Sequence, residues 1–195
     1  NLRPFLKTAS ALFITFLISA NVHGQTWNTV GNGIKTFGVQ GNIAIDGYPV
    51  FCTSDTNGVF VVSHYKNSSS STWGNYLLEK WDGVIWKQIK IPTGITPTDI
   101  AVFGSKIYMA GLGGLWEFDG TNWITQVPPG FTGNIITLEV ANGNLICGGA
   151  FFASGGISHL MRFDGTNFFA YPSFSWISTV NDILYFNNEL YVSCA

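Results

Sequence analysis

Residues 100–127 have the sequence IAVFGSKIYMAGLGGLWEFDGTNWITQV. Apolar and polar residues alternate through much of this stretch, and a period of two is typical of β-strands with one packed face. Short glycine-containing or polar pairs interrupt the alternation, and such pairs form the tight turns of hairpins. The stretch therefore predicts four short antiparallel strands, with the sequences IAVF, KIYMAG, GLWEF and NWITQV.

The Asp-Gly turn of this stretch occurs three times in the chain. It forms part of WDGVIW at 81–86, FDGTNW at 118–123 and FDGTNF at 163–168, at intervals of 37 and 45 residues. A catalytic residue is rarely needed three times in one short chain. Aspartate accepts hydrogen bonds from turn N–H groups, and glycine adopts the positive φ that such turns require. The residues assigned to structural turns are Asp82, Gly83, Asp119, Gly120, Asp164 and Gly165.

A hairpin pattern recurs in step with these turns. An apolar triplet, a polar turn and a second apolar triplet occur in IAIDGYPVFC at 43–52, IAVFGSKIYM at 100–109, LEVANGNLIC at 138–147 and ILYFNNELYV at 183–192. We expect each hairpin to begin a four-stranded sheet, with tight turns at one end and variable connections at the other. In the third strands, two sets of apolar residues align, and the charged residues between them are expected at solvated positions. The aligned sets are Leu78, Leu115 and Leu160, then Trp81, Phe118 and Phe163, with Lys80, Glu117 and Arg162 between them.

Four-stranded antiparallel sheets that recur every ~40 to 50 residues are typical of β-propeller blades. The sequence therefore predicts an all-β chain that forms a partial β-propeller over 25–195. Its blades span about 43–90, 100–127 and 137–171, and a fourth begins at 182–195. The strand TWNTVG at 26–31 is expected to complete the last blade and close the ring. Propellers have typically four to eight blades, so we expect the N-terminal fragment of a longer protein.

The first 24 residues have a different character. Arg3 and Lys7 precede an apolar stretch at 11–20 that is too short for a membrane span but suits the h-region of a secretory signal peptide. We expect a signal-peptide helix over 1–24, cleavage before Gln25, and a mature chain without a stable membrane span. The chain would then be secreted or displayed on the cell surface. The alternative is an uncleaved anchor helix.

Composition limits the partners and the chemistry. Hydrophobic residues make up 46 % of the chain and charged residues 10 %, and the net charge is −2. Lysine and arginine form no cluster after Lys7, so nucleic acid is not an expected partner. The sequence patterns of P-loops, nucleophile elbows and zinc proteases are absent from the sequence. We expect no catalytic residue, no cofactor and no metal site in this chain.

The cysteines and histidines are expected to be structural. Cys52 and Cys147 lie in apolar, strand-like runs and Cys194 near the end of the chain, without the spacing of a metal or redox site. We expect small buried hydrophobes, while their redox state stays open. The histidines are isolated from one another in sequence, at His23 in the predicted signal peptide, His64 and His159.

Three segments together resemble a known family of repeats. GGAFFASGGISHLMRFDGTNF at 148–168, with EKWDGVIW at 79–86 and WEFDGTNW at 116–123, is similar to the GGxF…(W/F)DGxxW propeller repeats of large secreted bacterial surface proteins. The resemblance covers most of 26–195 and departs from GGxF in the first two blades. It implies a propeller fold, and such proteins often carry a C-terminal sorting domain for type IX secretion. It implies no particular activity.

Noncatalytic binding is the predicted function. The segment 53–76 is expected to form the longest connection between a second and a third strand, and loops on a rigid scaffold commonly carry recognition. The candidate binding residues are Tyr65, Trp73 and Tyr76, whose rings could stack on a glycan or contact a protein, or instead pack under their own loop. The alternative function is the propeller part of a secreted carbohydrate-active enzyme whose catalytic residues lie outside this chain.

Overall fold

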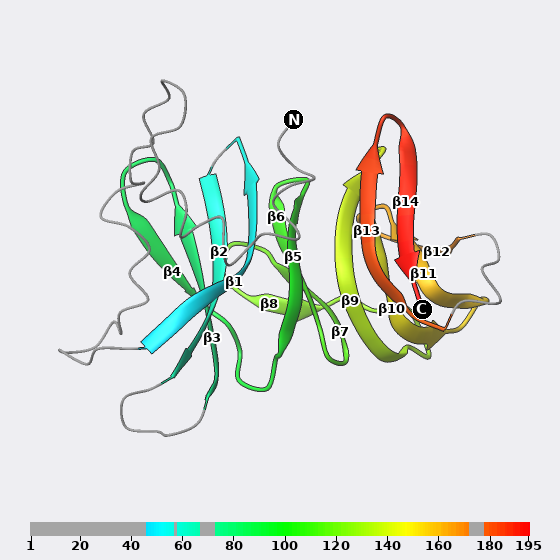
Figure 1. Ribbon diagram of the computed structural model, residues 1–195, viewed down its shortest axis with the longest axis horizontal. Helices are drawn as coiled ribbons and strands as arrows, with labels where there is room; N and C mark the ends of the chain where they lie inside the picture. The colour runs from blue at the N-terminus through cyan, green and yellow to red at the C-terminus, as the bar shows by residue number, and fades with distance from the viewer. Residues whose placement is uncertain (1–45, 57, 67–72, 172–177) are drawn as a thin grey trace. The chain divides into compact units, whose positions relative to one another are not determined.

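The computed structural model describes residues 46–56, 58–66, 73–171 and 178–195 (Figure 1). The predicted all-β class is confirmed, because every regular element of these residues is a β-strand. Among the described residues, no helix has the length and apolar character needed to cross a membrane. The predicted signal peptide and the closing strand at 26–31 lie outside the described residues.

The strands form antiparallel sheets in which neighbours along the chain are neighbours in space. Sheet 1 contains β1 (Asp46–Asp55), β2 (Gly58–Lys66), β3 (Trp73–Trp81) and β4 (Trp86–Lys90). Sheet 2 contains β5 (Pro97–Phe103), β6 (Lys106–Gly111), β7 (Gly114–Phe118) and β8 (Trp123–Thr125). Sheet 3 contains β9 (Thr132–Ala141), β10 (Asn144–Ala153), β11 (Ile157–Phe163) and β12 (Phe168–Ala170). The final hairpin contains β13 (Val180–Phe186) and β14 (Glu189–Cys194).

The chain divides into two compact units. Unit 1 spans Asn1–Thr93 and contains sheet 1, and unit 2 spans Gly94–Ala195 and contains sheets 2 and 3 and the final hairpin. Within unit 2, β9 lies beside both β5 and β13 (Figure 1). The first strands of successive sheets are therefore neighbours in this unit.

The predicted position of the first hairpin is wrong. The predicted turn at 46–47 lies inside β1, and the β1–β2 hairpin closes between Asp55 and Gly58. The segment 53–76 is consequently not a long connection, because it includes the end of β1, all of β2 and the start of β3. The two dipeptides, Asp-Gly at 46–47 and Asn-Gly at 57–58, have equivalent turn chemistry, so local pattern alone did not distinguish them.

The first strand of every sheet contains a β-bulge at the same place. In each pairing with the second strand the register shifts by one residue, and the strand then continues for four more residues to the tight turn. Bulges increase local twist and redirect side chains. The residues directly after the bulge are Phe51, Asp99, Thr137 and Asp182.

Sheet 3 has apolar side chains buried on both faces. On one face, Cys147, Phe151 and Met161 form a cluster with Tyr108 and Leu115 of sheet 2. On the other face, a second cluster joins sheet 3 to the final hairpin and contains Ala141, Ile146, Leu160, Val180 and Ile183. Burial of both faces of a sheet explains why its strands are nearly continuous apolar runs.

The Gly-Gly pair of sheet 3 permits two close approaches. A Cβ on Gly148 would lie 2.5 Å from Val180 Cγ1 and 2.8 Å from Ile183 Cδ1, in the final hairpin. A Cβ on Gly149 would lie 2.2 Å from Asn134 O and 2.9 Å from Ile135 Cα, in β9. The first glycine therefore makes room for the next sheet, and the second for the neighbouring strand.

The cysteines differ in exposure. Cys147 is fully buried, as expected, and burial raises its thiol pKa. Cys52 is half-buried. The expectation of burial is wrong for Cys194, which is exposed because it lies on β14, the second strand of the two-stranded final hairpin.

The Asp-Gly pairs lie in the turns between the third and fourth strands. Asp119 Oδ1 accepts hydrogen bonds of 2.8 Å from both Thr121 N and Asn122 N, and Gly120 has a φ of 104°. Asp82 and Asp164 make the equivalent bonds, followed by Gly83 with φ 99° and Gly165 with φ 102°. The backbone donors hold the pKa of the Asp119 carboxyl below its usual value.

Replacing Gly120 with valine is expected to lower the free energy of unfolding by about 1 to 2 kcal/mol, because a β-branched residue is strained at this positive φ. The space around the position is open, so backbone strain and not a clash causes the loss. Asp119→Asn retains an acceptor oxygen and should change stability by less than about 0.5 kcal/mol. Urea denaturation measures both variants, and an equal effect of the two would contradict this role for Gly120.

Candidate functional site

Three polar side chains form a row across the first strands of unit 2. They occupy the position directly after the bulge, which is Asp99 in β5, Thr137 in β9 and Asp182 in β13. Thr137 Oγ1 lies 3.3 Å from Asp99 Oδ2 and 3.4 Å from Asp182 Oδ1. The hydroxyl has a single proton and can donate to only one of the two carboxylates at a time.

The carboxylates of this row accept from backbone N–H groups. Asp99 Oδ1 accepts from Ile100 N at 2.8 Å, and Asp99 Oδ2 accepts from Leu138 N of the next sheet at 2.7 Å. Asp182 Oδ1 accepts from Ile183 N at 2.9 Å. Leu138 N–H, on the open edge of the first strand of sheet 3, thus donates a charge-assisted hydrogen bond to the carboxylate of Asp99 in sheet 2.

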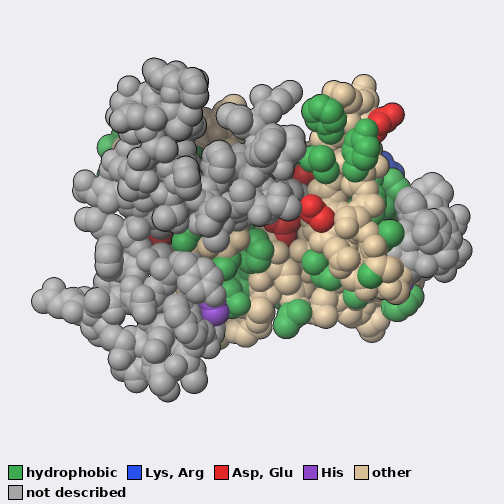
Figure 2. All heavy atoms as spheres, in the orientation of Figure 1, with side chains coloured by type: hydrophobic (Ala, Val, Ile, Leu, Met, Phe, Trp, Pro, Cys, Tyr) green, Lys and Arg blue, Asp and Glu red, His purple; other side chains and the backbone are tan. Residues whose placement is uncertain are grey.

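A second carboxylate joins the next pair of sheets in the same way. Glu139 Oε1 in β9 accepts from Tyr185 N in β13 at 3.2 Å, and the Glu139 side chain is buried. Figure 2 shows acidic side chains, drawn in red, over the region of β9 and β13. These carboxylates are therefore engaged in holding successive sheets of unit 2 together.

The sequence alone did not identify this row. Asp99 and Asp182 directly precede the apolar triplets at 100–102 and 183–185 of the recurring hairpin pattern, and the structure places both within strands, in β5 and β13. The available signal was their common spacing from the tight turn, because each is four residues before the last residue of its strand. The contacts with Thr137 join residues far apart in sequence, and local pattern carries no information about them.

A buried polar network surrounds Glu117 in sheet 2. The carboxylate accepts from Lys106 Nζ, from Tyr108 Oη at 2.8 Å and from Gln126 Nε2 at 3.3 Å. The expectation that Glu117 is solvated is wrong, because its side chain is buried between these partners. Burial first, and then the bond to the carboxylate, raise the pKa of the Tyr108 hydroxyl well above its usual value.

The predicted binding aromatics do not form one surface. Tyr76 in β3 pairs with His64 in β2, and their rings are stacked with centroids 4.6 Å apart. Tyr65 follows His64 directly, so it projects from the opposite face of the sheet. Trp73 begins β3, and its side chain lies outside the described part of the structure. All three residues thus lie in strands, and Tyr65 and Tyr76 are on different faces of the sheet.

Exposed apolar side chains occur at the other end of unit 2, where its sheets have their variable connections. Leu112 is 52 % exposed and Phe152 is 59 % exposed. The rings of Phe152 and His159 meet edge to face, with centroids 4.8 Å apart. His159 was expected to be isolated and structural. It is buried, has a φ of 58°, and its Nδ1 atom has no hydrogen-bond partner among the described residues.

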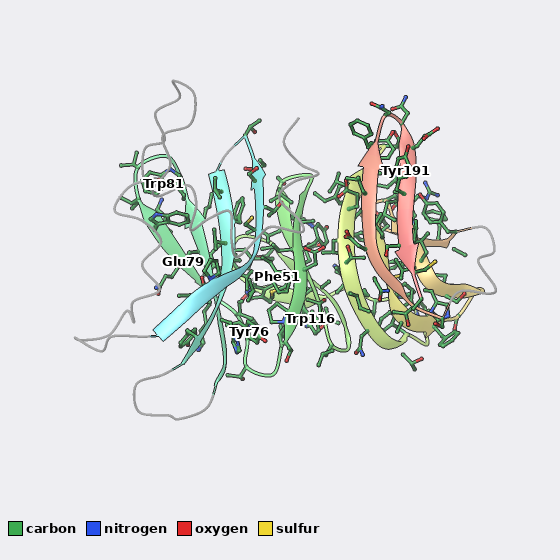
Figure 3. All side chains as sticks on the ribbon, viewed as in Figure 1. Phe51, Tyr76, Glu79, Trp81, Trp116 and Tyr191 are labelled. Atoms are coloured by element: carbon green, nitrogen blue, oxygen red, sulfur yellow. The ribbon has the colours of Figure 1, made fainter. Side chains whose placement is uncertain are left out.

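Sheet 1 contains a buried carboxyl, that of Glu79, at a position where sheets 2 and 3 have apolar side chains. Glu79 in β3 lies two residues before Trp81 on the same face of the sheet, and both are labelled in Figure 3. The equivalent residues of sheets 2 and 3 are Trp116 and Met161. Glu79 Oε2 and the Oγ of Ser63 are buried and have no hydrogen-bond partner in the described part of the chain. Burial raises the pKa of Glu79 from 4.5 to about 7, and a hydrogen bond with Gln88 opposes this rise.

The raised pKa makes the stability of unit 1 depend on pH. Between about pH 4.5 and 7 the folded chain retains a proton on Glu79 that the unfolded chain has lost, so the free energy of unfolding should fall as pH rises through this window. Above pH 7 the effect should level off. Glu79→Gln should remove this pH dependence. The free energy of unfolding of the variant should therefore rise relative to that of the wild type as pH increases. Denaturation at intervals from pH 4 to 8 measures the free energy of unfolding of both proteins. A difference between them that stays constant with pH would contradict the raised pKa of Glu79.

No group of three or more histidine, cysteine, aspartate or glutamate side chains with the geometry of a metal site occurs among the described residues. Comparison with known proteins found no family model and no curated protein sequence that matches the chain.

Proposed function

We propose that the chain forms part of a secreted or cell-surface β-propeller, which acts as a noncatalytic scaffold and binds an extracellular glycan or protein. The observation that carries this proposal is the fourfold recurrence of one hairpin, with its bulge at the same distance from the tight turn. Repeated sheets packed face to face, with each first strand beside the next, are the construction principle of propeller blades.

The packing of unit 2 supports the propeller assignment. Sheet 3 is covered on one face by sheet 2 and on the other by the final hairpin. Carboxylates link the first strands of these three elements, through Asp99 to β9 and through Glu139 to β13. Repetition of this packing, in which each sheet is covered by a neighbour on both faces, produces a ring of blades.

The division of each sheet into two different ends supports a binding role. Tight turns, fixed by the same Asp-Gly chemistry in each of sheets 1 to 3, close one end. The connections at the other end differ in length and sequence, and in unit 2 Leu112 of the β6–β7 connection and Phe152 near the end of β10 are exposed there. A uniform framework with varied loops at one end is a common arrangement for recognition.

Export is proposed from the sequence pattern of residues 1–24 and from the resemblance to secreted surface repeats. Expression in a bacterial host with the leader present, followed by fractionation and N-terminal sequencing, tests this part. Recovery outside the cytoplasm with Gln25 as the first residue is expected. Retention of the uncleaved chain in the inner membrane would contradict it.

The binding role is tested with the intact protein on an array of neutral and anionic extracellular glycans and, in parallel, by capture of surface proteins from the same cells. Saturable binding of one class without chemical change in it is expected. Conversion of a bound polysaccharide, lost on substitution of a single carboxylate, would show an enzyme and overturn the proposal.

A further inference from the structure

Charge is distributed unevenly between the two ends of unit 2. We define the loop end as residues 111–114, 126–136 and 149–159, which include the connections β6–β7, β8–β9 and β10–β11 and the adjoining strand residues. No aspartate, glutamate, lysine or arginine occurs in these segments. The charged residues of unit 2 occur instead at or near the tight turns, at Lys106, Glu117, Asp119, Arg162, Asp164 and Glu189, and within the first strands, at Asp99, Glu139 and Asp182. The loop end is thus neutral in a chain that places its charges elsewhere.

The loop end has apolar groups in a polar but uncharged setting. Phe152 is 59 % exposed and Leu112 52 % exposed. Leu112 forms a bridge with Asn134, and Asn134 Oδ1 accepts from Gly113 N at 3.1 Å. Asn134 pairs with Ala150 in β10, the strand that carries Phe152. The β6–β7 connection is therefore bonded to β9, and β9 is paired with the strand that carries Phe152.

His159, which contacts Phe152, has a strained backbone and an incompletely hydrogen-bonded side chain. Its φ of 58° is uncommon for a residue other than glycine, and its imidazole is 7 % exposed with an unpartnered Nδ1 atom. A buried polar atom without a partner is costly, and such costs and backbone strain concentrate at functional sites. The ring of Phe152 meets this imidazole edge to face at 4.8 Å between centroids.

We propose that the loop end of unit 2 is a binding site for a neutral carbohydrate, with Phe152 as the stacking surface and His159 Nδ1 as a hydrogen-bonding group. This inference rests on the proposed binding function and assigns it a ligand class and a place. The C–H face of a sugar ring is weakly positive and meets the negative face of an aromatic ring. Phe152 contacts the His159 ring, and an exposed side chain changes rotamer within nanoseconds, so a rotation of Phe152 can admit a sugar hydroxyl beside the imidazole.

Charge favours a neutral sugar over other ligands. Anionic glycans and phosphate backbones are bound mainly by lysine and arginine, and the loop end contains neither. Neutral hydrogen-bonding groups are present instead, at Thr132, Asn134, Ser154 and Ser158. A few polar groups around an aromatic surface match the alternating C–H and hydroxyl character of a neutral saccharide.

Affinity electrophoresis of the intact protein in gels containing β-1,3-glucan, mannan or xylan, with alginate and heparin as anionic probes, tests the proposal. Binding to a neutral polysaccharide is expected, and Phe152→Ala should weaken it at least tenfold. Phe186→Ala is the matched control, because Phe186 is an exposed phenylalanine at the tight-turn end of the same unit. His159→Asn, which keeps a residue tolerant of positive φ, should weaken binding at least threefold.

The outcomes separate this site from the general binding role. Retention by anionic probes or capture of a protein alone would overturn the carbohydrate site and leave the binding scaffold intact. Retention by a neutral glycan that is unchanged in Phe152→Ala, or reduced equally in Phe186→Ala, would overturn its location. Unchanged binding in His159→Asn would remove the histidine from the site. Binding to none of the glycans or surface proteins would overturn both proposals.

Discussion

Gly149→Ala is expected to lower the free energy of unfolding of unit 2 by about 3 kcal/mol or more. The added Cβ would lie 2.2 Å from Asn134 O and 2.9 Å from Ile135 Cα, and both are backbone atoms of the paired strand β9. A rotamer change cannot relieve such a contact, so β9 and β10 must separate where Phe151 enters the core. Chemical denaturation followed by tryptophan fluorescence measures the loss.

Gly143→Asn is the matched control for this glycine. Gly143 lies in the β9–β10 turn with a φ of 69°, and nothing lies within 4 Å of an added Cβ. Asparagine tolerates this conformation, so the expected change is less than about 1 kcal/mol. A loss in Gly149→Ala no larger than that of the control would contradict the close approach of β9 and β10.

Asp99→Ala is expected to lower the free energy of unfolding by about 2 to 3 kcal/mol. The substitution removes the acceptor of Leu138 N at 2.7 Å and of Ile100 N at 2.8 Å, and leaves Leu138 N–H without its partner from the neighbouring sheet. Because this bond joins sheets 2 and 3, the variant should also increase hydrogen exchange at Leu138. Denaturation and hydrogen-exchange mass spectrometry measure the two effects.

Asp182→Ala is the control for the row of polar side chains. Asp182 accepts from its own neighbour, Ile183 N, at 2.9 Å, and its contact with Thr137 Oγ1 is longer, at 3.4 Å. Its removal should therefore cost about 1 kcal/mol. Equal losses in the two variants, with exchange at Leu138 unchanged in Asp99→Ala, would show that the carboxylate does not link the sheets.

Strands joined by short, chemically distinctive turns could be predicted from the sequence. The expected strands KIYMAG and GLWEF coincide with β6 and β7, and the Asp-Gly pair at 119–120 lies in the β7–β8 turn. Such turns depend on a side-chain acceptor and a positive φ within four residues, so the information is local. The prediction was wrong in sheet 1, because Asp-Gly at 46–47 and Asn-Gly at 57–58 both have the residues of a tight turn and only the second pair lies at the β1–β2 hairpin.

The candidate sites depend on contacts that no local pattern encodes. Tyr65 and Tyr76 are near one another in sequence, yet strand pairing puts them on opposite faces of sheet 1. Phe152 could have been taken for a core residue, since Phe151 beside it is fully buried, and only the pairing in sheet 3 distinguishes them. The buried, unpartnered Nδ1 of His159 depends likewise on three-dimensional packing.

Incubation of the intact protein with the polysaccharide that it binds, with measurement of new reducing ends over time, distinguishes a binding scaffold from an enzyme. A noncatalytic scaffold predicts saturable retention of the polysaccharide without new reducing ends, and the same retention by Glu79→Gln, whose parent carboxyl has a pKa raised to about 7. Reducing ends that accumulate over many turnovers, and that disappear in Glu79→Gln or another single carboxylate variant while binding persists, would contradict it.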